Sequence, residues 1–364
     1  MKTPLYRFVG FLLLLWPLLV NCDQEPLFYD ISMEIPPIKP LIDGAPSRIV
    51  EYNNKIYVSN GILWEYDGSS WHKMAQPPGG DVKTVAATTG YLFALSWNGG
   101  LYRWDGSTWT QTGTAGTKPE QIFGAGANLY AGALSGSPGT ANGYCILEID
   151  TSTWGVNVIK SSTGLLMGAA TNGTNTFLGI LYGGIVDAAS PGAIISSPGN
   201  SVIGILNHNG TIVAVTAGGS VEYLDGGTFK TLTSNGDLSG ALATWDDGTD
   251  KMLLLGIRDS SGSYGYGYRE LHWDGNPSTV LTADRRLYYP GETTSLSSVA
   301  NNIQYTNAIG DHPVTVLYVG TSSWVPRADT ESRPIIVAST IKDGLWSYRT
   351  RGGQAQWNGE DNSN

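Results

Sequence analysis

The sequence predicts an all-β protein, a β-propeller of seven four-stranded blades. The 364 residues include 48 glycines, 12 tryptophans and 19 tyrosines, whereas charged residues make up only 14%. Glycine and aromatic residues placed among short apolar runs suit tight turns and pleated strands better than helices. A Trp/Gly-rich motif also recurs along the chain, and a repeat of about 40 residues has the length of one propeller blade.

The recurring motif has Asp-Gly after an alternating apolar strand, often with an aromatic residue shortly downstream. Its clearest copies are ILWEYDGSSW at 62–71 and GLYRWDGSTW at 100–109. Looser copies lie at 146–154, 221–229 and 270–275, and a final one at 344–357. The intervals of 38, 45, 75 and 49 residues place one weaker unit between 150 and 225; they separate Asp67, Asp105, Asp150, Asp225 and Asp274.

The second unit shows how a blade is expected to form. Alternating strands are predicted at 84–87, 91–95, 101–104 and 108–112, separated by Thr-Gly, Asn-Gly-Gly and Asp-Gly. These are hairpin signals, because glycine, and to a lesser degree asparagine and aspartate, can adopt a positive φ. A lone four-stranded sheet cannot bury both faces, so neighbouring blades must pack around a closed ring.

Seven blades follow from the positions at which the units begin, near residues 48, 83, 120, 165, 201, 238 and 295. Extra material between 282 and 343 keeps six or eight blades open as alternatives. We expect the ring to close by strand exchange, in which the segment 42–48 or 354–357 completes a blade begun at the other end of the domain.

The first 22 residues have the features of a signal peptide. Lys2 and Arg7 precede an apolar run at 8–20, which as a helix would span about 20 Å, less than the ~30 Å hydrocarbon core of a bilayer. The run ends in Leu-Val-Asn-Cys at 19–22, which resembles a bacterial lipobox, although asparagine departs from the usual small residue before the cysteine. Relaxed lipoboxes of this kind resemble those of spirochaetes. The resemblance implies lipid attachment at Cys22; secretion with cleavage elsewhere is the alternative.

The predicted organisation is a lipoprotein signal peptide at 1–21, a proline-rich extended tether at 22–46 and a single propeller domain at 47–364. Cys22 and Cys145 are the two cysteines of the chain. A lipid on Cys22 leaves Cys145 unpaired, in an apolar run where a cysteine is expected to act as a small buried hydrophobe.

The charge of the chain excludes one class of partner. The formal net charge is −10, and loss of Lys2 and Arg7 with the signal peptide takes it to −12. An acidic surface repels nucleic-acid phosphates and anionic headgroups. We therefore expect no nucleic-acid partner, and contact with the membrane only through the N-terminal lipid.

No catalytic site, metal site or cofactor is predicted. The four histidines, His72, His208, His272 and His312, lie in separate units without metal-ligand spacing. No nucleophile elbow, P-loop or dinucleotide-binding fingerprint occurs. The Asp-Gly-x-x-Trp pattern is similar to the Asp box of sialidases but lacks a residue between Asp and Gly. We attribute it to hairpin geometry, since a turn aspartate bonds its own backbone.

Three insertions in blade loops are the candidate binding surfaces, at 134–142, 259–268 and 322–332. Tyrosine and tryptophan suit contact surfaces because a broad apolar ring carries a polar tip. The alternative is that these rings fill gaps between blades. The candidate residues are Tyr264, Tyr266, Tyr268 and Trp324.

Residues 48–360 resemble the degenerate Trp/Gly-rich propeller repeats of bacterial exported lipoproteins. The resemblance implies a non-enzymatic envelope protein, anchored by lipid at the periplasmic face or the cell surface, that recognises a protein or glycan partner through its rim loops. A propeller glycan hydrolase or lyase with a central-channel site is the alternative, and it requires Arg, Glu and Tyr to converge across blades. An outer-membrane assembly partner is a third reading.

Overall fold

The computed structural model describes residues 40–114, 116–134, 143–162, 164–196, 201–234, 238–246, 248, 251–258, 267–279, 283–285, 312–320, 335–341, 343–351 and 354–360. All of them belong to one compact unit, Pro40–Asn364, which is distinct from Met1–Lys39. Every regular element in these ranges is a β-strand. No helix found there is long and apolar enough to cross a membrane.

The described strands form seven four-stranded antiparallel sheets, each built from strands consecutive in the chain. The first two blades are β1 (Ile49–Tyr52), β2 (Lys55–Ser59), β3 (Leu63–Tyr66) and β4 (Trp71–Lys73), then β5 (Val82–Ala87), β6 (Leu92–Ser96), β7 (Leu101–Trp104) and β8 (Trp109–Thr112). The third and fourth are β9 (Lys118–Ala125), β10 (Asn128–Leu134), β11 (Tyr144–Asp150) and β12 (Val156–Ser162), then β13 (Leu166–Thr171), β14 (Thr176–Ile180), β15 (Gly184–Asp187) and β16 (Ser190–Ile194).

The remaining three blades follow the same order. The fifth is β17 (Val202–His208), β18 (Thr211–Thr216), β19 (Ser220–Asp225) and β20 (Thr228–Ser234). The sixth is β21 (Leu238–Asp246), β22 (Lys251–Ile257), β23 (Tyr268–His272) and β24 (Ala283–Arg285). The seventh is β25 (Val314–Gly320), β26 (Ile335–Thr340), β27 (Leu345–Arg351) and β28 (Gln354–Gly359).

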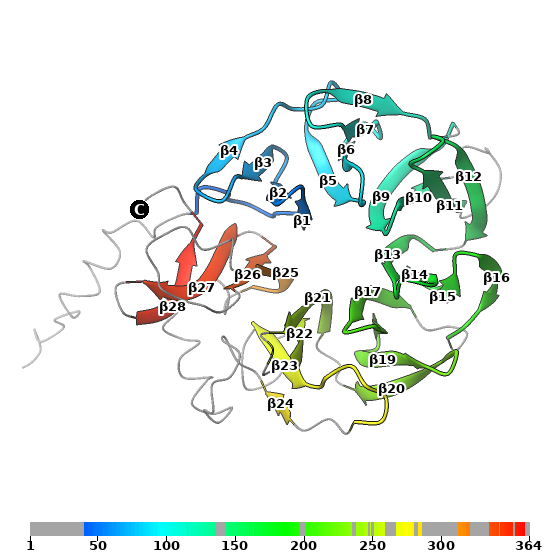
Figure 1. Cartoon of the computed structure of the whole chain (residues 1–364), viewed down its shortest axis with the longest axis vertical. Coiled ribbons are helices and arrows are strands. Elements are labelled where there is room, and N and C mark those ends of the chain that lie inside the picture. Colours follow the sequence, from blue (N-terminus) through cyan, green and yellow to red (C-terminus); the bar gives the residue numbers. More distant parts are fainter. Residues whose placement is uncertain are drawn as a thin grey trace, which may run out of the picture. The chain divides into compact units, whose positions relative to one another are not determined.

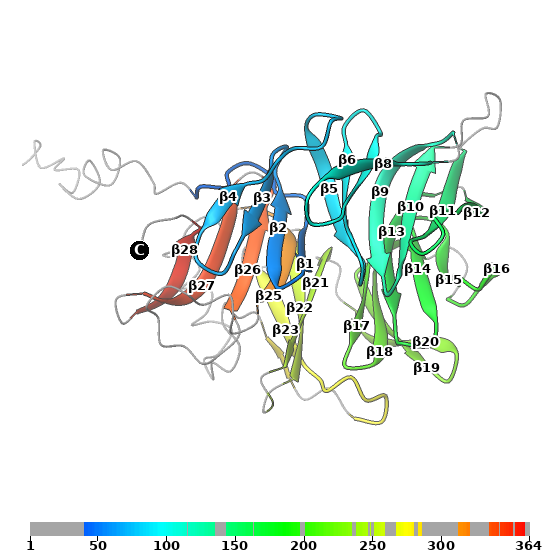
Figure 2. The same cartoon turned by 45° about the horizontal axis from the view of Figure 1, so that its top comes forward.

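The predicted seven-bladed propeller is confirmed. The first strand of each blade lies innermost and contacts the first strand of the next, and β25 (orange) contacts β1 (blue), which closes the ring (Figures 1 and 2). Six blades begin within two residues of the predicted positions. The seventh begins at Val314 and not near 295, since its first described strand starts 29 positions after Arg285, where β24 ends.

The second strand of each blade forms the centre of the core. All five residues of β6 are buried, and so are five consecutive residues of β18, because each strand lies within a sheet whose two faces are covered by neighbouring blades. Burying an apolar side chain of this size stabilises the fold by roughly 1.5–3 kcal/mol. Outer strands are more polar and more exposed, as β16 illustrates.

The ring closes without strand exchange, which corrects the expectation from the sequence. β28 pairs with β27 of its own blade, and the segment Pro40–Gly44 instead lies against the turn between β26 and β27. The N–H of Leu41 donates to the carbonyl of Glu360 at 2.7 Å, and the N–H of Leu345 donates to the carbonyl of Ile42 at 2.9 Å. Because the seventh blade already holds four strands, the N-terminal segment serves as a seal and not as a fifth strand.

Two buried side chains complete this joint. Ile42 is 0% exposed and packs in one cluster with Ile49 of β1 and Ile335 of β26. The carboxylate of Glu360, 1% exposed, accepts a hydrogen bond from the indole N–H of Trp71 in β4 at 3.0 Å and another from the hydroxyl of Ser347 in β27. The first and last blades are therefore joined at their inner and outer strands.

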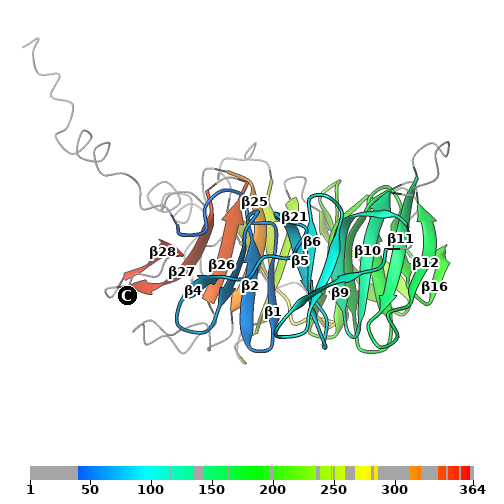
Figure 3. The same ribbon diagram turned by 90° about the horizontal axis from the view of Figure 1, so that it is seen from above.

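The antiparallel order gives the ring two different faces, which lie at the top and bottom of the edge-on view in Figure 3. Turns between the first and second and between the third and fourth strands share one face, the aspartate face. Turns between the second and third strands share the other with the blade-to-blade connections, as the bridge between Gly61 and Val82 illustrates. We call it the Pro40 face, because Pro40–Gly44 lies there beside the β26–β27 turn.

We predict that Ile42→Ala lowers the free energy of unfolding by about 2–4 kcal/mol, because it opens a cavity at the joint. Leu41→Ala is the matched control. Leu41 is the preceding residue, and because its side chain is 38% exposed, its truncation loses little packing. Denaturant unfolding of the Cys22→Ala chain measures both variants. Equal effects at the two positions would show that Ile42 does not seal the ring.

Candidate functional site

A pocket of about 320 Å³ opens at the centre of the ring. It is lined by the innermost strands of five blades, β1, β5, β9, β13 and β25. A second pocket of about 420 Å³ shares Glu51 with the first and is lined by Asn53, Asn54, Thr88 and Thr89 in turns of the aspartate face. The central pocket therefore has its mouth on that face.

Arg48, directly before β1, reaches across to the third blade. One terminal nitrogen donates to the carbonyl of Ile122, and the guanidinium carbon lies 4.0 Å from the centre of the Phe123 ring. Burial lowers the pKa of Arg48 to about 10, which still leaves the side chain cationic at neutral pH. Arg48 thus places a positive charge in the wall of the pocket.

A glycine sets the width of the wall beside this cation. A Cβ atom at Gly124 would lie 1.7 Å from the carbonyl oxygen of Ala87. Only glycine therefore lets β9 approach β5 this closely. The close approach brings Ile122 and Phe123 within reach of Arg48.

Glu51 and Tyr318 form a polar pair across the joint between β1 and β25. The phenol of Tyr318 donates to Oε2 of Glu51 at 3.0 Å. Burial, and next the charge of Glu51, raise the pKa of Tyr318 well above the usual 10, so the phenol remains protonated. The pocket thus offers a phenol oxygen that can accept, a carboxylate acceptor and a cation whose remaining N–H groups can donate, a set suited to hydrogen-bonding a polar ligand.

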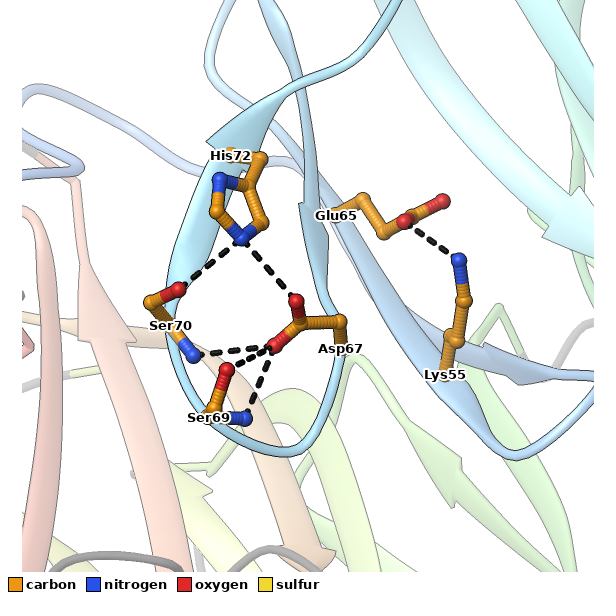
Figure 4. A network of polar contacts seen from close by, with 6 residues as sticks. All are labelled: Lys55, Glu65, Asp67, Ser69, Ser70 and His72. Carbon is orange, nitrogen blue, oxygen red and sulfur yellow. Dashed lines mark hydrogen bonds and ion pairs between the residues drawn. The ribbon is translucent and has the colours of Figure 1, made fainter.

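The recurring aspartates are turn residues, as the sequence indicated. In Figure 4 the carboxylate of Asp67 accepts the hydroxyl of Ser69 at 2.7 Å and the backbone N–H groups of Ser69 and Ser70 at 2.8 and 3.0 Å. His72 lies 3.0 Å from its other oxygen, and the neighbouring Lys55–Glu65 ion pair spans 2.6 Å. The hydrogen bond from the Ser69 hydroxyl, followed by the two backbone bonds, holds the pKa of Asp67 far below its usual range.

Two further turns repeat this geometry. Asp105 accepts backbone hydrogen bonds from Thr108 and Ser107, which hold its pKa far below the usual range. The hydroxyls of Ser152 and Thr153, with the Ser152 N–H, lower the pKa of Asp150 to about 2. These carboxylates stabilise hairpins, and within the described ranges no three His, Cys, Asp or Glu side chains could hold a metal ion.

Most of the predicted site residues lie outside the described residues, namely Cys22, Tyr264, Tyr266 and Trp324. Tyr268 is described, and its position differs from a surface loop. It is the first residue of β23, is 1% exposed and packs edge-on to Trp357 with ring centres 6.4 Å apart. The Tyr268 ring fills the space between the sixth and seventh blades, which was the alternative for these residues.

Cys145 and His208 are core residues. The Cys145 side chain is 3% exposed in β11, and burial raises the pKa of its thiol. His208, fully buried, lies 2.7 Å from both the Thr244 hydroxyl and the Trp273 carbonyl, and burial lowers its pKa. The cysteine agrees with its expected role as a small buried hydrophobe.

The pocket residues themselves were not identified from the sequence. Glu51 and Tyr318 are 267 positions apart, and no flanking motif marks either of them. The one available signal was general: the first strands of propeller blades converge at the centre of the ring. The polar residues of these first strands could therefore have been grouped as one candidate site.

Comparisons with known proteins agree with the resemblance expected from the sequence. Residues 6–128 match the model of the TP013X lipoprotein family, a stretch that includes Cys22 and the first two blades. An uncharacterised lipoprotein of Treponema pallidum (strain Nichols) is 30% identical over 111 residues, covering 29% of this chain and 28% of the relative. A second is 32% identical over 126 residues, covering 32% and 26%. The chain therefore aligns with little more than a quarter of the length of these curated relatives.

Solved structures support the fold alone. A chain in the crystal structure of the mitotic checkpoint complex has a TM-score of 0.54 and 13% identity, over 86% of this chain and 94% of that chain. At this identity the likeness carries no information about function.

The low aspartate pKa values predict a pH-dependent stability. In the unfolded chain these carboxyls titrate near 3.9. Their stabilisation is therefore present above that pH and is lost as pH falls through the folded value, about 2 for Asp150. We expect the triple variant Asp67→Asn, Asp105→Asn and Asp150→Asn to melt several degrees below the parent at pH 7, with the gap narrowing towards pH 2. A gap that is independent of pH would contradict the charge-based account.

Proposed function

We propose that this chain is an exported, lipid-anchored binding protein that takes a neutral glycan at the mouth of its central pocket and does not transform it. The lipobox-like sequence ending in Cys22 supports the anchor, as does the match to a lipoprotein family over residues 6–128. The lipoprotein name of the treponemal relatives agrees with this reading. The pocket supports the binding role.

The central observation is the polar set in the pocket. Arg48 and Glu51 contribute opposite charges, so the described lining carries no strong net charge that would select an ion. Tyr318, Asn53 and Thr88 add hydroxyl and amide groups at the two adjoining pockets. Sugars present hydroxyls that both donate and accept, so this mixture of donors and acceptors suits them. A protein partner that inserts polar side chains is the competing occupant.

Three features of the pocket argue against turnover. Hydrolysis of a glycoside uses a pair of carboxyl groups in most enzymes of this class, whereas Glu51 is the one carboxylate among the described residues lining either pocket. The raised pKa of Tyr318 keeps its phenol protonated, which disfavours it as a base or nucleophile near neutral pH. Arg48 is also already engaged with Ile122 and Phe123.

A hydrolase or lyase is the second candidate function. One observation favours it: Arg48, Glu51 and Tyr318 converge from the first and seventh blades on one pocket, which is the cross-blade cluster that such an enzyme requires. Release of new chain ends from a panel of neutral and acidic glycans would support this candidate. Binding without release supports the first.

We predict that Tyr318→Phe weakens binding of a neutral oligosaccharide from the panel by about tenfold, because the phenol oxygen that accepts from the sugar, and the hydrogen bond that orients Glu51, are both lost. Tyr130→Phe is the matched control, since its phenol also donates to a glutamate, Glu148, at 2.9 Å outside the pocket. Calorimetric titration measures both. Equal loss in the two variants, or binding by neither variant nor parent, would contradict the proposed site.

We also predict that Cys22→Ala abolishes labelling by a fatty-acid analogue and leaves the signal peptide at 1–21 uncleaved, because the lipobox cysteine is the residue that is modified and becomes the new N-terminus. Mass spectrometry of the N-terminal peptide supplies the direct readout. The control is Cys145→Ala, whose thiol is buried in β11. Retained lipid label in Cys22→Ala would contradict the anchor.

A further inference from the structure

Exposed apolar side chains gather at one type of turn. In the described residues, the turn between the second and third strands carries or adjoins such a side chain in five of the seven blades. Trp97 and Tyr182 are 62% and 70% exposed, which leaves most of each ring in solvent. The five residues are Ile62, Trp97, Leu134, Tyr182 and Ile341.

All five lie on the Pro40 face, because every turn of this type opens on that side of the ring. Leu41, exposed as well, lies there in the segment bonded to Glu360. Single exposed hydrophobic residues are common on proteins and need no explanation. Repetition at equivalent turns around a ring is different, because it distributes apolar tips over one flat side of the molecule.

The opposite face has a contrasting composition. Its described turns contain no large exposed apolar side chain and are rich in Asn, Asp, Gly, Ser and Thr. Two aromatic residues in these turns, Tyr91 and Trp154, are partly buried against the core. Lys55, Lys230 and Lys251 on this face are each ion-paired with a carboxylate. Seven aspartates lie at its turns: Asp67, Asp105, Asp150, Asp187, Asp225, Asp246 and Asp274.

Tyr182 gives an independent indication that its tip is presented outwards. Its φ of +60° is a left-handed conformation that a bulky side chain rarely adopts. The N–H of Tyr182 donates to the hydroxyl of Ser201 at 3.2 Å, which helps to hold the turn. The backbone conformation of Tyr182 is unfavourable, and burial of its ring does not compensate for it. Strained residues of this kind are typical of functional contacts.

The chain itself indicates what this face meets. It enters the propeller at Pro40, on the same face, and Cys22 precedes Pro40 by 18 residues. A fully extended segment of that length reaches at most about 60 Å. If Cys22 carries lipid, as proposed above, the Pro40 face can lie against the bilayer that holds its acyl chains.

We propose that the Pro40 face docks on the lipid bilayer, with the five turn residues entering the boundary between headgroups and acyl chains. Tryptophan and tyrosine favour this boundary because their rings are apolar and their tips are polar. The seven aspartates of the aspartate face then point away from the headgroups, and Asp43, Asp81 and Asp343 remain on the docking side. Most of the turn carboxylates therefore do not oppose the contact. This adds a protein surface to the lipid at Cys22 as a means of membrane contact.

The test uses the mature chain, from residue 22 onwards, with Cys22→Ala. Neither the apolar signal peptide nor a lipid is then present, so any vesicle binding comes from the rest of the protein. Neutral phosphatidylcholine vesicles are the probe, and flotation measures the bound fraction. We expect the triple variant Trp97→Ser, Tyr182→Ser and Ile341→Ser to lower the partition coefficient at least about tenfold, since partition scales with the apolar area buried. Val158→Ser is the control, because Val158 is 53% exposed on the outer strand β12.

A second measurement reports orientation. An environment-sensitive fluorophore is attached to Ile62→Cys on the Pro40 face or to Thr174→Cys in a turn of the aspartate face, in the same background. Vesicles should shift the emission to the blue at position 62 and leave it unchanged at 174. A shift at 174 alone, or at neither position, would overturn the docking proposal.

The two proposals fail separately. Vesicle binding by the Cys22→Ala chain, with no lipid found on the native protein, would retire the anchor and keep the docking face. A lipidated native protein whose Cys22→Ala form neither floats nor responds to the triple variant would retire the docking face and keep the anchor. Self-association through the Pro40 face in sedimentation, without vesicle binding, would assign the face to a second copy and also overturn docking.

Discussion

The joint between the first and seventh blades is the contact on which the rest of the molecule depends. Each sheet hides its apolar faces only when both neighbours are in place, so an open ring would expose the sides of β1 to β4 and β25 to β28. The joint rests on Ile42, on the carboxylate of Glu360 and on a few backbone hydrogen bonds. The pocket rests on it too, since Glu51 and Tyr318 lie on its two sides.

The antiparallel order within blades separates two chemistries without any dedicated domain. Because equivalent turns always open on the same side, a bias in one turn type becomes a property of a whole face. Asp-Gly and Asn-Gly hairpins make one face polar and acidic, with the pocket mouth at its centre. Trp97, Tyr182 and their counterparts make the other face apolar. A protein held to a membrane through the second face would present the first to solutes.

Turn sequences and strand alternation predicted the blades well, but they could not predict contacts between residues far apart in the chain. Turn sequences such as Asn98-Gly99-Gly100 fix strand ends through positive φ, which any single sequence reveals. Tyr268 was placed in a loop because the neighbouring tyrosines suggested one, although it stands at the start of a strand in the repeat. The sequence predicts Ile42 both in the proline-rich tether and in a segment, 42–48, that completes a blade; the structure has it packed at the joint without forming a strand. Arg48, Glu51 and Tyr318 acquire their meaning only from ring closure, which no local pattern encodes.

The place where the chain enters the ring has a mechanical consequence. Tension transmitted along the polypeptide from an N-terminal attachment would act first on the bonds of Leu41 and Ile42 to the seventh blade. Only a few backbone hydrogen bonds hold this segment, so the load would reach them before it reaches the four-stranded sheets. The contact that is loaded first is thus the joint between the first and seventh blades, which also carries Glu51 and Tyr318. A partner that pulls on the anchored protein would open this joint and separate the two residues of its own binding site.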